Sequence, residues 1–193
     1  MSAGEVVAVI ERDRPYYETS AGGVTLSGGE PLFQYRFAAD ILARCRARGL
    51  HTAIETAGWS SARALAQVLR YTDLVFFDLK TMDPGKHERV IGKPLARVIA
   101  NARLVAASGV PLVVRVPVVP GFNDDEASMR AIMDFAGEVT SHMALLAYHQ
   151  LARAKYDRLG REYSMGATPA TQEDTLTRLA ALGLAKGLEV TCE

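Results

Sequence analysis

Short apolar runs alternate along the chain with longer windows in which apolar residues recur every three or four positions. Such runs predict strands, and the windows between them predict amphipathic helices. The predicted strands are residues 23–26, 51–55, 74–79, 111–119, 144–148 and 188–191. Residues 74–77 and 112–114 contain no polar side chain, which is typical of strands covered on both faces. The alternation predicts an α/β fold with a parallel sheet and crossover helices.

Three of the windows between the strands carry a clear apolar stripe. The stripes are Phe37, Ile41, Leu42 and Cys45; Val98, Ala102, Val105 and Ala106; and Met129, Ile132, Met133 and Ala136. Gly49 and Gly109 stand where helices end, and residues 123–125 offer side-chain oxygens to a helix start. Five or six βα units are fewer than a closed eightfold barrel needs. We therefore predict a partial (β/α) barrel, an open parallel sheet of five or six strands, in one domain over residues 1–193.

Composition and charge narrow the function classes. The chain is 49% hydrophobic and 23% charged, as a globular domain is, and 22 basic residues balance 22 acidic ones. This balance gives no overall attraction to nucleic acid or to an anionic membrane. Without a signal-peptide pattern or a run of membrane-spanning length, we expect a cytoplasmic protein. The two cysteines, Cys45 and Cys192, form neither a CxxC pair nor a disulfide framework, and Cys45 is expected to be a buried, inert thiol.

Charged and glycine residues gather where the predicted strands end. They are Ser27, Gly28, Gly29 and Glu30 after the first strand, Glu55 and Thr56 on the second, Asp78 and Lys80 on the third, Arg115 in the fourth, and His149 after the fifth. Each has a structural reading, such as a tight turn at the glycines, an Asp78–Lys80 ion pair, an Arg115 salt bridge to Glu55 or Asp78, or a packed histidine. Parallel strands end at one edge of a sheet, so these residues should lie close together. The occurrence of charged and glycine residues at several strand ends favours a ligand site at this edge.

The ordered set of motifs resembles the activating proteins of glycyl radical enzymes such as pyruvate formate-lyase, within the radical SAM superfamily. It consists of GGVTLSGGEPL at 22–32, IETAG at 54–58, DLK at 78–80, RVPVVPGFND at 115–124 and YH at 148–149, followed by Lys155, Tyr156, Leu159 and Gly160. The resemblance runs from about Glu5 to the C-terminus.

The resemblance implies a radical SAM, TIM-barrel-like fold and two cofactors, S-adenosylmethionine and a 4Fe-4S cluster. It places Ser27, Gly28, Gly29 and Glu30 at the methionine amino group, and Glu55, Thr56, Asp78 and Lys80 at the methionine and ribose portions, with Arg115 and His149 completing the pocket. The implied partners are a glycyl radical enzyme, whose glycine Cα loses a hydrogen atom, and an electron donor such as flavodoxin or ferredoxin.

The family's CxxxCxxC motif does not occur in this sequence. We therefore expect the C-terminal part of such an enzyme, with the cluster in the full-length protein only, no catalytic or metal-binding residue here, and no activity alone. An exposed sheet edge is expected to promote self-association. Two alternatives stay open: a naturally short, cluster-free protein that binds S-adenosylmethionine or the partner, and an unrelated aldolase with Lys80 as a Schiff base. The motifs do not identify the partner.

Overall fold

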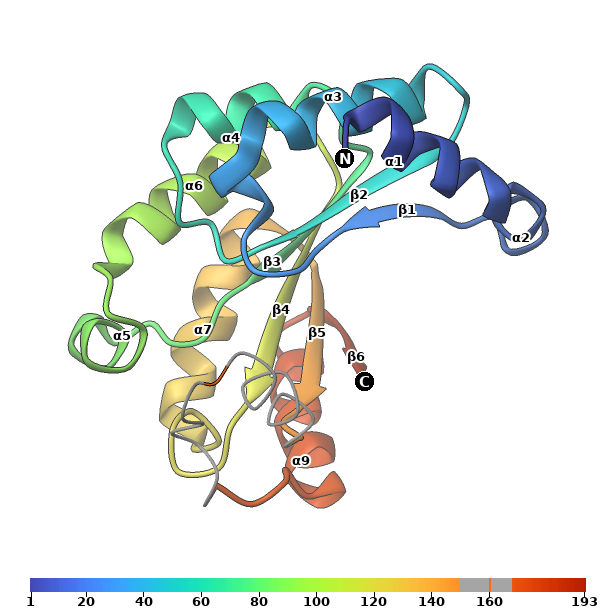
Figure 1. The fold of residues 1–193 in the computed structure, drawn as a ribbon. Coiled ribbons are helices and arrows are strands. Elements are labelled where there is room, and N and C mark those ends of the chain that lie inside the picture. The colour runs from blue at the N-terminus through green and yellow to red at the C-terminus, as the bar shows by residue number, and fades with distance from the viewer. Residues whose placement is uncertain (150–159, 161–167) are drawn as a thin grey trace. The chain divides into compact units, whose positions relative to one another are not determined.

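Six strands form the sheet of this protein, described from a computed structural model that covers residues 1–149, 160 and 168–193 (Figure 1). They are β1 (Gly23–Leu26), β2 (His51–Thr56), β3 (Leu74–Asp78), β4 (Leu112–Val118), β5 (His142–Ala147) and β6 (Glu189–Cys192). Their order in the sheet follows their order in the chain. All six predicted strands are confirmed, with ends that differ by at most two residues.

The strand pairs β1–β2, β2–β3 and β5–β6 are parallel. Leu26 lies opposite Ile54, and Thr56 lies opposite Phe77, so the carboxyl ends of β1, β2 and β3 lie at one edge. β1 and β6 are the first and last strands of the order. The predicted fold class, an open parallel α/β sheet of the partial-barrel type, is confirmed. Self-association through the β1 edge stays a prediction.

The chain divides into two compact units, the first comprising Met1–Asp78 and Pro94–Val113. Its helical elements are α1 (Ala3–Ile10), η1 (Glu11–Asp13), α2 (Arg14–Ser20), η2 (Pro31–Gln34), α3 (Tyr35–Arg46), α4 (Ala62–Leu69) and α6 (Leu95–Ser108). α1 contacts α3, α3 contacts α4, and α4 contacts α6, so these four helices form a row (Figure 1). Under the row, Val7 of α1, Val24 of β1 and Ile41 of α3 share a buried cluster.

The buried face of α3 differs in one position from the predicted stripe. Ile41, Leu42 and Cys45 are buried as predicted, but Phe37 is 37% exposed, so its placement in the core was wrong. Ala38 occupies the buried position instead. Successive helix residues are rotated by about 100°, so the stripe that contains residues 38, 41, 42 and 45 turns residue 37 toward solvent.

The second unit comprises Leu79–Lys93 and Val114–Glu193. Its helices in the described residues are α5 (Pro84–Ile91), α7 (Glu126–Val139) and α9 (Glu173–Ala185). α9 contacts α7, β5 and β6. Met129, Ile132, Met133 and Ala136 of α7 are buried, which confirms the predicted stripe. The single domain over residues 1–193 stays a prediction.

Helix α7 begins at the cap predicted from the sequence. The Asp125 carboxylate accepts a hydrogen bond of 2.8 Å from the backbone N–H of Ser128. The side-chain and backbone hydrogen bonds of Ser128, with a smaller contribution from Lys86, lower the pKa of Asp125. The free N–H groups of a first helical turn favour a negative charge at this position.

We expect Asp125→Ala to lower the free energy of unfolding by about 1 kcal/mol, the usual contribution of an N-cap. Because the folded pKa is lowered, the charged carboxylate stabilises the fold above the ordinary aspartate range and loses this effect as the pH falls through the folded value. Asp125→Asn keeps a capping oxygen that does not titrate. Urea unfolding at several pH values should therefore show the wild type losing its advantage over Asp125→Asn in acid; a constant difference would contradict this assignment.

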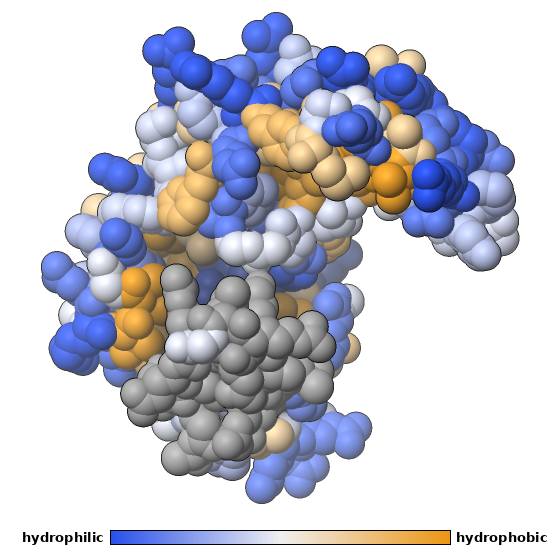
Figure 2. Space-filling model, in the orientation of Figure 1, coloured by the Kyte–Doolittle hydropathy of each residue, from blue (hydrophilic) through white to orange (hydrophobic). Residues whose placement is uncertain are grey.

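The surface of the first unit fits this arrangement of amphipathic helices. Figure 2 shows mainly hydrophilic residues over the outer face of α3. α1 differs, because Glu5 is its one charged side chain and Val9 is exposed on it. Over residues 1–149, 160 and 168–193, no helix is both long and apolar enough to cross a membrane.

Candidate functional site

The candidate site in the first unit consists of two neighbouring loops at the carboxyl ends of strands. Residues 27–30, the glycine loop, follow β1, and residues 57–61, the β2 loop, follow β2. The parallel pairing of β1 with β2 puts both loops at the same edge of the sheet. In open parallel α/β sheets, ligands bind outside this edge.

The glycine loop presents an accessible backbone. The Ser27 hydroxyl donates a hydrogen bond of 2.5 Å to the Glu55 carboxylate. A Cβ atom placed on Gly28 or Gly29 would meet no other atom within 4 Å. Gly28 has a φ of +113°, a conformation that other residues rarely adopt. The loop can therefore bring backbone N–H and C=O groups close to a ligand.

Glu30 connects the two loops through its carboxylate. One oxygen accepts hydrogen bonds from the backbone N–H of Leu32, at 3.1 Å, and from the Thr56 hydroxyl, at 2.8 Å. The other oxygen accepts from the backbone N–H of Ala57 at 3.0 Å. Glu30 thus makes three internal hydrogen bonds. Its predicted contact with a methionine amino group stays a prediction, and the structure adds a second task, the alignment of the two loops.

Thr56 is also engaged inside the protein. Its side chain is buried, and its hydroxyl donates to Glu30 and accepts from the backbone N–H of Gly58 at 3.0 Å. A hydroxyl has one proton to donate, and Glu30 already receives it. Any direct contribution of Thr56 to a ligand is therefore restricted to its remaining acceptor site.

The other predicted site residues are divided between the two units. Asp78 ends β3 in the first unit, whereas Lys80, Arg115 and His149 belong to the second. Arg115 is half-buried in β4, and His149, directly after β5, is exposed. The prediction that Asp78, Lys80, Arg115 and His149 face one ligand stays a prediction. Lys155, Tyr156 and Leu159, quoted for the resemblance, lie outside the described residues.

Asn123 positions the segment that carries Lys80, a role that the sequence did not reveal. It is fully buried, and its side-chain N–H groups donate to the carbonyl oxygens of Lys80, at 2.8 Å, and Pro117, at 2.9 Å. Its side-chain oxygen accepts from the backbone N–H of Val119 at 2.7 Å. From the sequence, residues 123–125 indicated a helix start, and the residue that caps α7 is Asp125.

Thr171 makes a similar connection in the second unit. Its hydroxyl donates to the carbonyl oxygen of Val118, at the end of β4, and accepts from the backbone N–H of Tyr148, after β5. The segment next to His149 is therefore linked to the end of the neighbouring strand. Thr171 stands 53 residues from Val118 and 23 from Tyr148, so no local sequence pattern marks this link.

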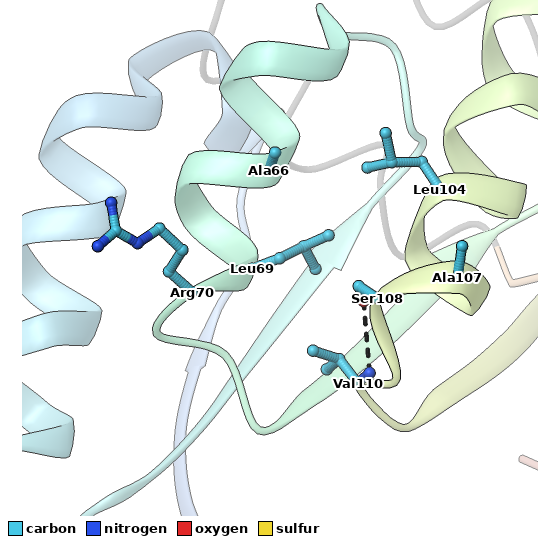
Figure 3. Close-up of a pocket in the computed structure, with 7 residues that line it drawn as sticks. All are labelled: Ala66, Leu69, Arg70, Leu104, Ala107, Ser108 and Val110. Carbon is cyan, nitrogen blue, oxygen red and sulfur yellow. Dashed lines mark hydrogen bonds between the residues drawn. The ribbon is translucent and has the colours of Figure 1, made fainter.

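A separate hollow of about 420 Å³ lies in the first unit, where α4 and α6 end (Figure 3). It is lined by Ala66, Leu69, Arg70, Leu104, Ala107, Ser108 and Val110. These helix ends lead into the amino ends of β3 and β4, the edge opposite to the glycine loop. The hollow is largely apolar apart from Arg70 and Ser108. Its position separates it from the candidate site.

Comparison with known proteins identifies the family. The sequence profile of the radical SAM superfamily matches residues 1–136. The chain belongs to the radical SAM superfamily. It is 39% identical over 180 residues to the isethionate sulfite-lyase activating enzyme of Nitratidesulfovibrio vulgaris, covering 92% of this chain and 58% of that protein. It is 37% identical over 183 residues to the pyruvate formate-lyase 2-activating enzyme of Escherichia coli, covering 94% of this chain and 63% of that protein.

A solved structure agrees with these relatives. A domain of the pyruvate formate-lyase-activating enzyme of Bacteroides vulgatus superposes with a TM-score of 0.74 at 28% identity, covering 89% of this chain and 99% of that domain. These matches confirm the predicted resemblance to activating proteins. The chain spans about 58% of the length of the first curated relative.

The radical SAM family implies S-adenosylmethionine, and the glycine loop fits such a ligand. Open space surrounds Gly28 and Gly29, and their backbone groups lie at the ligand-binding edge of a parallel sheet. A ligand with amino and carboxylate groups can hydrogen-bond to exposed backbone groups of this kind. The residues therefore fit the polar end of S-adenosylmethionine.

The cysteines of this chain do not fit a 4Fe-4S cluster. The sequence has two cysteines, and Cys45 is fully buried in α3. Burial raises the pKa of the Cys45 thiol, whereas iron ligation requires the thiolate. Among residues 1–149, 160 and 168–193, no three His, Cys, Asp or Glu side chains form a group able to hold a metal.

Proposed function

We propose that this chain supplies the S-adenosylmethionine-binding part of an activating enzyme whose substrate is a glycyl radical enzyme. The observation that carries the proposal is the open glycine loop, aligned with the β2 loop by Glu30 at the carboxyl edge of β1 and β2. The similarity to activating enzymes over more than nine-tenths of the chain supports this choice among radical SAM functions.

In this proposal, the chain's own residues bind and orient the cofactor. Backbone groups at Gly28 and Gly29 receive its amino and carboxylate groups, and the Glu55 carboxylate, hydrogen-bonded to Ser27, adds negative charge beside them. When bound and cleaved by one electron, S-adenosylmethionine would supply the radical that removes a hydrogen atom from a glycine of the partner protein. An electron donor such as flavodoxin or ferredoxin is the second partner in this proposal, as the source of the electron.

The two cysteines favour a second candidate function, binding of S-adenosylmethionine or of the partner enzyme without radical chemistry. A cluster needs three or four thiolates held together, and this sequence offers one buried thiol, Cys45, and one exposed thiol, Cys192. Both candidates expect this chain to stay colourless on reconstitution with iron and sulfide, so the intact mass of the protein isolated from its own organism separates them. A mass above 20.9 kDa supports the first candidate, and a mass of 20.9 kDa supports the second.

Binding of S-adenosylmethionine, measured by isothermal titration calorimetry, tests the proposal through the Gly29→Val variant. Gly29 has an ordinary φ and open space around it, so valine should fold without strain and enter the space assigned to the ligand. We expect the affinity to fall at least about tenfold, equivalent to about 1.4 kcal/mol. The unfolding free energy should change by no more than about 0.5 kcal/mol, as for other surface substitutions.

Gly4→Val is the matched control. It adds the same side chain at an exposed position of α1, where the nearest atoms lie 4.0 Å from the new Cβ, and it should leave the affinity unchanged. If the wild type does not bind S-adenosylmethionine, or if Gly29→Val binds it as the wild type does, the proposed site is wrong.

A further inference from the structure

Helix α6 contains a buried polar side chain that its own helix does not require. Asn101 is 3% exposed and lies in the middle of α6. Asparagine is a poor helix former, and a buried amide is unfavourable unless it is hydrogen-bonded. The side-chain NH₂ group of Asn101 donates to the carbonyl oxygens of Gly58, at 2.7 Å, and Ser60, at 2.9 Å. Both of its N–H donors are therefore committed to the β2 loop.

The same face of α6 holds the β2 loop at a second point. Arg97 precedes Asn101 by four residues, so both side chains project from one side of the helix. The Arg97 guanidinium lies over the Trp59 ring, 4.4 Å from its centre. Contacts from α6 thus reach three consecutive residues, Gly58, Trp59 and Ser60.

The opposite side of the β2 loop is bound to the glycine loop. The backbone N–H of Ala57 donates to Glu30, and the backbone N–H of Gly58 donates to the Thr56 hydroxyl, which in turn donates to Glu30. Glu30 directly follows Gly29 in the chain. A continuous set of hydrogen bonds therefore runs from Asn101 through the β2 loop to the glycine loop.

We propose that Asn101 is a positioning residue for S-adenosylmethionine. Its side chain fixes the β2 loop and, through Glu30, the glycine loop, without contacting the ligand. This inference rests on the proposed function, because it takes the glycine loop as the place where the ligand binds. Its role is distinct from general stabilisation of α6, since its two donors end on loop carbonyl oxygens and not on the helix.

Asn101→Asp tests this role with almost no change in side-chain shape. It replaces the amide NH₂ by an oxygen that faces two carbonyl oxygens, so both hydrogen bonds to the β2 loop are lost. We expect hydrogen exchange at the backbone amides of residues 57–60 to become at least about tenfold faster, and the affinity for S-adenosylmethionine to fall by about tenfold. Asn101→Ala, which leaves space for water at the two carbonyls, should give the same pattern and serves if the aspartate variant does not fold.

Val105→Ala is the matched control on the same helix. Val105 is fully buried one turn further along α6, and its truncation leaves a cavity without removing a hydrogen bond. It should lower the melting temperature while the affinity and the relative protection of residues 57–60 stay as in the wild type. If Asn101→Asp speeds exchange no more in this loop than elsewhere, or if it leaves the affinity unchanged, the inference is overturned. If the proposed function itself is wrong, the wild-type protein does not bind S-adenosylmethionine, and this result is distinguishable from the outcomes above.

Discussion

Gly58→Ala is expected to lower the free energy of unfolding by about 2–5 kcal/mol, the sum of a backbone and a packing penalty. Gly58 has a φ of +71°, which disfavours any residue with a Cβ. The new Cβ would lie 2.2 Å from Cζ of Phe77, far inside van der Waals contact. Phe77 is fully buried in β3, so its ring has little room to move. Urea denaturation followed by circular dichroism measures the loss.

Gly49→Ala separates the two penalties. Gly49 has a φ of +73°, close to that of Gly58, but a Cβ there would meet no atom within 4 Å. This control should cost only the backbone penalty, about 1–2 kcal/mol. The excess in Gly58→Ala then measures the contact with Phe77. Equal losses in the two variants would show that the ring yields without cost.

Asn123→Ala is expected to lower the free energy of unfolding by about 3 kcal/mol or more. Three hydrogen bonds are lost, and the buried backbone N–H of Val119 loses its acceptor. An unsatisfied buried polar group costs about 1–3 kcal/mol, and the two carbonyl oxygens lose their donor as well. The loss should appear as a lower urea midpoint with an unchanged denaturant slope.

Asp124→Ala provides the neighbouring control. The Asp124 carboxylate accepts one hydrogen bond of 2.9 Å, from the backbone N–H of exposed Gly121. Water can replace this bond, so the variant should lose less than about 1 kcal/mol. A loss in Asn123→Ala as small as in the control would contradict the positioning role of Asn123.

The strands could be predicted because their signal is local. Residues 74–77 and 112–114 are continuously apolar, and β3 and β4 form there. The cap at Asp125 was recognisable for the same reason, since its partner Ser128 is three residues away. Phe37 shows the limit of this information, because two overlapping helical stripes contain Ile41 and Cys45, and packing selected the one with Ala38.

The candidate site could be predicted in part. The sequence indicated that residues 27–30 and 55–56 end neighbouring strands, and the structure brings Ser27 to Glu55 and Glu30 to Thr56. It did not indicate that Glu30 makes three hydrogen bonds within the protein. Asn101 was missed because its acceptors, Gly58 and Ser60, are 43 and 41 residues away. Contacts of this kind depend on the fold and leave no periodic trace in the sequence.

The two asparagines that hold strand-end loops share a property with consequences for solution behaviour. Asn101 and Asn123 act through neutral amide groups, which neither titrate nor attract counter-ions. The hydrogen bonds that they make to the segments around Gly58 and Lys80 should therefore depend little on the salt concentration. Ionic conditions act instead on the charged groups around these loops, Glu30 among them, so that the attraction of a charged ligand can vary while the contacts of the two asparagines do not.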